Sequence, residues 1–187
     1  MDWVDVMSAL KADPAETAAI AKSLSDWPLS SAAYFAGVQK KLKDSIAYGQ
    51  YSIFTNGYWG HPAYKLPPEV NLLGVAHYLQ ALVWQRDMIK IHTILGGKNP
   101  HPNFLVGGMA CAINMNNDQA INQFSLSYLK QLVQTCHDFI HKVYYPDIVA
   151  IAGFYKDYAH IGASNPNFFC TGAPSEINTG APAGKGM

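Results

Sequence analysis

The feature that most constrains the fold is a glycine- and proline-rich run over residues 95–109, which follows a long apolar stretch. Its two prolines, Pro100 and Pro102, fix the backbone φ angle and donate no hydrogen bond, and each disfavours helical geometry in the residue before it. A glycine pair on each side permits backbone conformations that other residues avoid. We therefore predict that a helix ends here and that a stiff loop presents His101 between the two prolines.

The stretch before this loop predicts one long helix over residues 67–95, about 40 Å long at roughly 1.5 Å per residue. Two prolines at its start and Glu69 in its first turn suit a helix N-terminus. From Val70 to Trp84 the apolar residues surround the helix axis instead of forming one stripe. This pattern is typical of a helix that is buried on most sides. We expect the glycine pair Gly96-Gly97 to end it.

The rest of the chain also reads as mostly α. Helices are expected over residues 2–10, 13–25, 30–47 and 118–142, and from Pro146 to 157. Asp13 followed by Pro14 is a good helix start, because Asp caps free backbone N–H groups and Pro has none to satisfy. Residues 49–66 are aromatic and turn-rich, which fits either a hairpin at Asn56-Gly57 or a packed loop. The predicted fold is a multi-helix segment with one long buried helix and aromatic, Gly/Pro-rich loops.

Composition limits the classes of function. Hydrophobic residues make up 49% of the chain and charged residues 14%, against a typical charged share of about 25%. This shortfall fits a chain whose surface is largely covered by other protein. The formal net charge is zero, which gives no electrostatic footprint for nucleic acid. The first residues lack the basic and apolar regions of a signal peptide, and we find no apolar window long enough for a membrane span.

The three cysteines, Cys111, Cys136 and Cys170, do not form a recognisable ligand set. No CxxC pair occurs in the sequence. A cysteine-only zinc ribbon, a thioredoxin-type pair and an iron–sulfur ligand run are therefore all excluded. Because the count is odd, one thiol stays free under any disulfide scheme.

A second candidate for chemistry is the pair His137 and His141. Histidines at positions i and i+4 share one helix face and can both reach a zinc ion, and His160 is a conceivable third ligand. However, Asp138 stands where the zinc-protease motif has the longer Glu. Histidines on a solvated helix face are the plainer interpretation. On the long helix, His77 and His92 are fifteen residues apart and are expected to be core or interface histidines.

Several segments, taken together, resemble the large subunit of nickel-iron hydrogenases, in its membrane-bound uptake branch. The loop GGKNPHPNFLVGG over residues 96–108 is the most specific of them. The others are Ser8–Pro14, Asn56–Glu69, Lys90–Ile94, Val143–Asp147 and Gly153–Asp157. The resemblance runs over about residues 3–158, in the order and spacing of the family. It implies that residues 1–158 are a helical middle part of a large-subunit domain, and we expect residues 159–187 to be an irregular, poorly ordered tail.

The resemblance implies a role for the loop. In the family the histidine of the PHP motif, His101 here, lies at the interface with the small subunit, beside the iron–sulfur cluster nearest the active site. There it donates a hydrogen bond that stabilises the cluster's negative charge. Lys98 would add positive charge, and Pro100, Pro102 and Asn103 would complete the interface. The plain alternatives are a histidine bonded to a nearby carbonyl and a solvated lysine. A phosphate-binding loop is excluded, because the GxxxxGK[ST] spacing is missing.

The resemblance also identifies what the sequence lacks. In the family four cysteine thiolates hold nickel, two in an RxCGxC motif and two in a DPCxxC motif. Neither motif occurs here, so we expect no catalytic residue and no bound Ni–Fe centre in this chain alone. The chain corresponds to about the middle third of a large subunit. After about residue 158 the sequence fits the family poorly, so we expect the resemblance to break there.

Three hypotheses follow. The first is a part of an uptake hydrogenase large subunit that is inactive alone. The full enzyme would oxidise H2 to protons and electrons, pass the electrons to an iron–sulfur small subunit and a membrane cytochrome b, and lie on the periplasmic side of the cytoplasmic membrane. The second is a non-catalytic helical module that docks an iron–sulfur partner protein. The third, a zinc hydrolase built on His137 and His141, has the least support.

Overall fold

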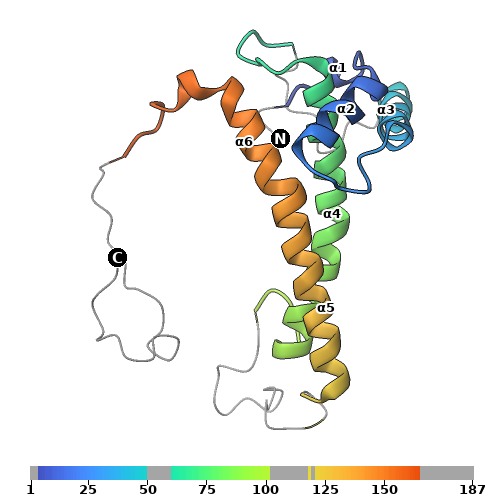
Figure 1. Cartoon of the computed structure of the whole chain (residues 1–187), viewed down its shortest axis with the longest axis vertical. Coiled ribbons are helices and arrows are strands. Elements are labelled where there is room, and N and C mark those ends of the chain that lie inside the picture. Colours follow the sequence, from blue (N-terminus) through green and yellow to red (C-terminus); the bar gives the residue numbers. More distant parts are fainter. Residues whose placement is uncertain (1–3, 50–59, 102–117, 119–120, 165–187) are drawn as a thin grey trace. The chain divides into compact units, whose positions relative to one another are not determined.

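The computed structural model describes residues 4–49, 60–101, 118 and 121–164 (Figure 1). The chain divides into two units, residues 1–154 and residues 155–187. Every regular element in the described ranges is a helix, so the prediction of a mostly α fold is confirmed. The turn-rich segment around Asn56 lies outside the described residues, as do Cys111 and Cys170.

Three helices precede the long one: α1 (Val6–Ala9), α2 (Pro14–Leu24) and α3 (Ala32–Ala47). Each begins at a side chain that caps free backbone N–H groups. The Asp13 carboxylate accepts a hydrogen bond from the Ala15 N–H at 2.8 Å, as the Asp-Pro start predicts. Asp5 caps α1, which is much shorter than the expected helix over residues 2–10.

The long helix α4 (Pro68–Gly96) lies at the centre of the first unit, and α1, α2 and α3 contact it (Figure 1). Gly97 ends the helix in a left-handed conformation, with φ at 78°, as the glycine pair predicts. Burial follows the prediction only in the first part of the helix. Val70 to His77 are almost all buried, whereas Val83 is 54% exposed.

The second long helix differs from the prediction. We expected one helix over residues 118–142 and a separate helix after Pro146. Instead α5 (Gln123–Phe139) continues through a π-helical segment, η2 (Ile140–Tyr144), into α6 (Tyr145–Phe154). The Tyr145 N–H donates to the Ile140 carbonyl, five residues back. A wider turn of this kind lets a helix accommodate an irregularity such as a proline, so Pro146 does not end the helix.

The core lies where α1, α2 and α3 meet the first part of α4, and Val143 of η2 adds to it. Its largest fully buried apolar side chains are those of Phe35, Leu72, Leu73, Val6, Val75 and Val143. Asn71 is also fully buried. Its side-chain N–H group donates to the Leu66 carbonyl at 2.9 Å, and its oxygen accepts from the Asp5 N–H at 2.8 Å. This amide therefore joins the start of α4 to the N-cap of α1 and satisfies its own polar atoms.

The second unit begins at Tyr155 and has one described element, the short 3-10 helix η3 (Lys156–Tyr158). The rings of Tyr155 and Tyr158 contact each other, with centroids 5.8 Å apart. The predicted boundary at residue 158 and the predicted lack of order in the tail stay predictions. In the ranges described, none of the helices has an apolar stretch long enough to cross a bilayer.

Candidate functional site

The predicted interface loop follows the C-terminus of α4. This loop contains Lys98, Pro100 and His101, and all three residues are exposed. The His92 ring, on the last turns of α4, is joined to the Asn99 side chain by a hydrogen bond of 2.6 Å. Together with the left-handed Gly97, this bond fixes the direction in which the loop leaves the helix. Pro102 and Asn103 lie outside the described residues.

The loop therefore presents a histidine and a lysine at the surface. Two neighbouring donors, an imidazole and an ammonium, can bind an acceptor or an anionic group of a partner.

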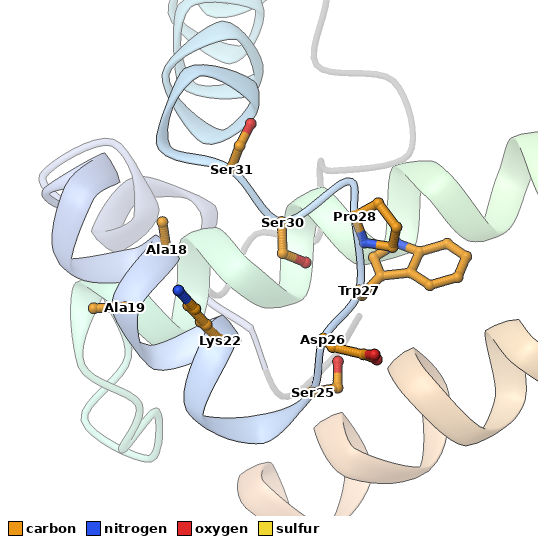
Figure 2. Close-up of a pocket in the computed structure, with 9 residues that line it drawn as sticks. All are labelled: Ala18, Ala19, Lys22, Ser25, Asp26, Trp27, Pro28, Ser30 and Ser31. Atoms are coloured by element: carbon orange, nitrogen blue, oxygen red, sulfur yellow. The ribbon is translucent and has the colours of Figure 1, made fainter.

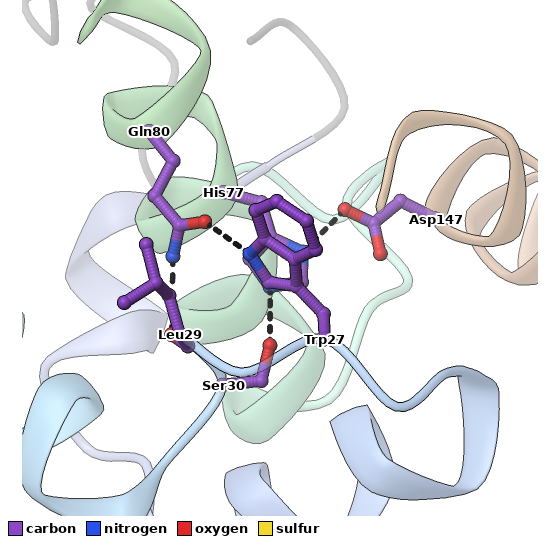
Figure 3. A network of polar contacts seen from close by, with 6 residues as sticks. All are labelled: Trp27, Leu29, Ser30, His77, Gln80 and Asp147. Atoms are coloured by element: carbon purple, nitrogen blue, oxygen red, sulfur yellow. Dashed lines mark hydrogen bonds and ion pairs between the residues drawn. The ribbon is translucent and has the colours of Figure 1, made fainter. Parts of the chain in front are cut away.

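A second polar arrangement, which the sequence did not predict, lies inside the first unit. The buried His77 ring on α4 bonds to two residues from distant segments (Figure 3). Its Nδ1 atom lies 2.6 Å from a carboxylate oxygen of Asp147 on α6, and its Nε2 atom lies 3.0 Å from the Ser30 hydroxyl oxygen. The short contact with Asp147 is typical of a charge-assisted hydrogen bond.

A second pair of bonds runs beside the first (Figure 3). The Trp27 indole N–H donates to the side-chain oxygen of Gln80 at 2.7 Å, and the Gln80 amide donates to the Leu29 carbonyl at 3.2 Å. His77 and Gln80 are three residues apart and so lie on one face of α4. This face of α4 therefore holds the connection between α2 and α3 in place, and His77 also holds α6.

Hydrogen bonds link Ser30, His77 and Asp147 in the Ser–His–Asp arrangement of a hydrolase triad. The surroundings of the three residues do not fit catalysis. Ser30 lines a hollow of about 440 Å³ between α2 and the connection that follows it (Figure 2). His77 and Asp147 line a different hollow, between α4 and α6. A hydrolase needs one cleft that the serine and histidine both reach, with donors for an oxyanion. We therefore assign a structural role to the three residues.

Two charged residues, Lys22 and Asp26, line the hollow around Ser30 (Figure 2). Asp26 forms a salt bridge of 2.9 Å with Lys142, which lies outside the hollow lining. The hydrogen bond from Lys142 and its charge lower the pKa of the Asp26 carboxyl, and the same contact raises the pKa of Lys142. An Asp that stays ionised in an exposed ion pair is unsuited to general acid catalysis.

The zinc hypothesis is not supported by the described residues. The rings of His137 and His141 do lie close together, with centroids 4.2 Å apart. However, no group of three or more His, Cys, Asp or Glu side chains with metal-binding geometry occurs among the described residues. A catalytic zinc ion needs three protein ligands. Both histidines are exposed, His137 on α5 and His141 on η2.

The chain matches a known protein family over almost its whole length. The family model for nickel-dependent hydrogenases matches residues 1–185. The match continues beyond residue 158, so the sequence-based expectation that the resemblance breaks there is wrong. The segment after residue 170 is rich in Gly, Ala and Pro, so it offers few apolar positions on which a similarity can be recognised.

Curated relatives agree with this family. The chain is 53% identical over 165 residues to the Hydrogenase-1 large chain of Escherichia coli (strain K12), an alignment that covers 87% of this chain and 28% of the relative. It is 54% identical to the uptake hydrogenase large subunit of Rhizobium leguminosarum bv. viciae, with the same coverage. It is 45% identical over 184 residues to that of Afipia carboxidovorans, which covers 95% of the chain and 30% of the relative. The chain thus spans less than a third of these relatives' length.

Proposed function

The chain belongs to the family of nickel-dependent hydrogenases, and we propose that it is part of the large subunit of an uptake hydrogenase. The observation that carries this proposal is the identity of 53% and 54% with two hydrogenase large subunits. In the proposed protein this chain supplies helical scaffold and one surface loop. The complete enzyme oxidises H2 to protons and electrons.

The residues of this chain do not fit the metal centre of such an enzyme. A nickel–iron centre takes soft thiolate ligands in pairs. Among the described residues the only free cysteine is Cys136, and the sequence contains no CxxC pair. The centre therefore belongs to other segments of the proposed large subunit.

The role proposed for this chain lies in the loop after α4. His101, Lys98 and Pro100 are exposed, and the His92–Asn99 bond of 2.6 Å fixes the start of the loop. With Pro102 and Asn103, they form the proposed contact with an iron–sulfur small subunit. His101 donates a hydrogen bond to the negatively charged edge of a cluster, which makes the reduced cluster more stable.

The proposed partners and location follow from the same family. Electrons pass from the large subunit to the iron–sulfur small subunit and from there to a membrane cytochrome b. The complex lies on the periplasmic side of the cytoplasmic membrane. The relatives named uptake hydrogenase large subunit support the direction of H2 consumption.

The first test is to sequence the source DNA on both sides of the coding region. We expect one reading frame that carries an RxCGxC motif upstream and a DPCxxC motif downstream. Purified together with its iron–sulfur small subunit, the product of that frame should reduce a viologen dye with H2. A frame that contains neither motif would contradict the proposal and favour a non-catalytic module that docks an iron–sulfur protein.

A second test addresses the loop. In the complete large subunit, His101→Ala should weaken co-purification with the tagged small subunit or shift the reduction potential of its nearest cluster. His137→Ala is a matched control, since His137 is also exposed but lies on α5. Unchanged co-purification and an unchanged potential in His101→Ala would contradict the interface role.

A further inference from the structure

Helix α6 has the composition of a buried helix but is not buried. Its sequence, Tyr-Pro-Asp-Ile-Val-Ala-Ile-Ala-Gly-Phe, contains one charged residue, Asp147, and that carboxylate already contacts His77. No residue of α6 is buried. A helix that is apolar all round is typical of the interior of a protein.

The uncovered apolar side chains are distributed around α6. Tyr145 is 64% exposed, Ile148 45%, Val149 55% and Phe154 42%. At about 100° per residue these positions cover well over half of the helix circumference. A side chain added at Gly153 would meet no atom within 4 Å, so this side is open as well. A single flat partner covers one face of a helix, and these residues need cover on several faces.

The side of α6 that faces α4 is also incompletely filled. A hollow of about 650 Å³ lies between the two helices. It is lined mainly by apolar side chains of α4, η2 and α6, including Tyr78, Ala81, Val143 and Ile151. Figure 1 shows the helix made of α5 and α6 running alongside α4. Well-packed protein interiors rarely leave an apolar space of this size empty.

The hydrogenase relatives are much longer than this chain, so other segments are available to fill this space. The chain spans 28–30% of the length of three relatives, so most of a large subunit lies in other segments. Only 14% of this chain's residues are charged, which fits a segment with little surface of its own. Resting on the function proposed above, we infer that α6 and the hollow beside α4 are enclosed by the remaining segments of the hydrogenase large subunit. In the complete protein, α6 is a central helix.

The test compares two cysteine variants, Val149→Cys and Phe154→Cys, which lie about 140° apart around α6 at 100° per residue. Each is made in this chain alone and in a complete large subunit. The complete subunit is obtained by exchanging this chain for the matching segment of the Rhizobium leguminosarum bv. viciae relative, to which it is 54% identical. Labelling by a maleimide is followed by peptide mass spectrometry, with the denatured proteins as the reference for full accessibility.

In this chain alone, we expect both cysteines to react rapidly, at close to the rate in the denatured protein. In the complete subunit, both should be protected at least tenfold. Protection of only one cysteine would overturn the inference, because it would indicate a one-sided interface such as a partner subunit provides. Rapid labelling of both would overturn it too. Protection in this chain alone, with a dimer mass by light scattering, would show that a second copy covers α6 and would also overturn the inference.

The same preparation separates this inference from the proposed function. If the exchanged subunit binds nickel and, together with its small subunit, reduces a viologen with H2 while both cysteines react rapidly, the function stands and the inference about α6 fails. If the exchanged subunit without cysteine variants does not fold, although the relative itself does, the chain is not an equivalent part of a large subunit and the proposed function fails.

Discussion

The His77 Nδ1 atom and a carboxylate oxygen of Asp147 lie 2.6 Å apart, although the two residues are 70 positions apart in the sequence. Both side chains are largely shielded from water, with 6% and 14% of their surfaces exposed. This bond joins α4 to α6, a helix in which no residue is buried. Asp147 is the only charged residue of α6, the most apolar of the described helices, and therefore anchors that helix.

Asp147→Asn tests this anchor. The variant keeps the size of the side chain and removes its charge, so we expect the free energy of unfolding to fall by about 1–3 kcal/mol. Urea unfolding of the chain measures it. Asp138→Asn is the control, because Asp138 is 44% exposed and should change stability by less than about 0.5 kcal/mol. Equal effects of the two variants would contradict an anchoring role.

Two tryptophans that both contact Phe139 allow a test of whether the Trp27–Gln80 hydrogen bond stabilises the fold. Trp27 donates its indole N–H to Gln80 at 2.7 Å, whereas the buried indole nitrogen of Trp84 meets no acceptor among the described residues. Replacement of either by Phe removes a similar volume. Trp27→Phe should be more destabilising than Trp84→Phe by about 1–2 kcal/mol, since it leaves the Gln80 oxygen without its donor. Thermal unfolding compares the two variants. A larger loss of stability in Trp84→Phe would contradict a stabilising role for the Trp27–Gln80 hydrogen bond.

Glycines in two helices are expected to respond differently to alanine. A Cβ atom at Gly37 would meet nothing within 4 Å, so Gly37→Ala should stabilise α3 by about 0.5–1 kcal/mol through helix propensity. A Cβ atom at Gly74 would lie 3.0 Å from a methyl group of Val4. That contact should cancel the gain in α4. Similar melting temperatures for the two variants would show that Val4 moves aside freely.

The Asp26–Lys142 pair gives a pH dependence with a definite sign. The hydrogen bond and charge of Lys142 lower the pKa of Asp26 from its usual value of 3.8. A carboxyl with a lowered pKa contributes stability above its unfolded pKa and loses it as the pH falls through the folded value. Asp26→Asn should therefore flatten the dependence of melting temperature on pH below about pH 4. Because the pair is exposed, the effect is small and should shrink in high salt.

Local signals in the sequence determined much of the fold. The start of α2 at Asp13-Pro14 and the end of α4 at Gly97 depend on the conformations of a few neighbouring residues, so they can be predicted from short motifs. The loop that presents Lys98 and His101 was predicted for the same reason, because prolines and glycines restrict the backbone wherever they occur. The family, too, was recognisable from the order and spacing of its motifs.

Other features were decided only by tertiary structure. Nothing near Pro146 in the sequence predicts the π-helical segment before it, by which one helix continues where we expected two. The bonds of His77 to Ser30 and Asp147 join residues from three segments, and no local pattern encodes such a meeting. The apolar composition of α6 is typical of a buried helix, yet none of its residues is buried in this structure. Propensity and capping act over a few residues, whereas packing depends on which distant surfaces meet.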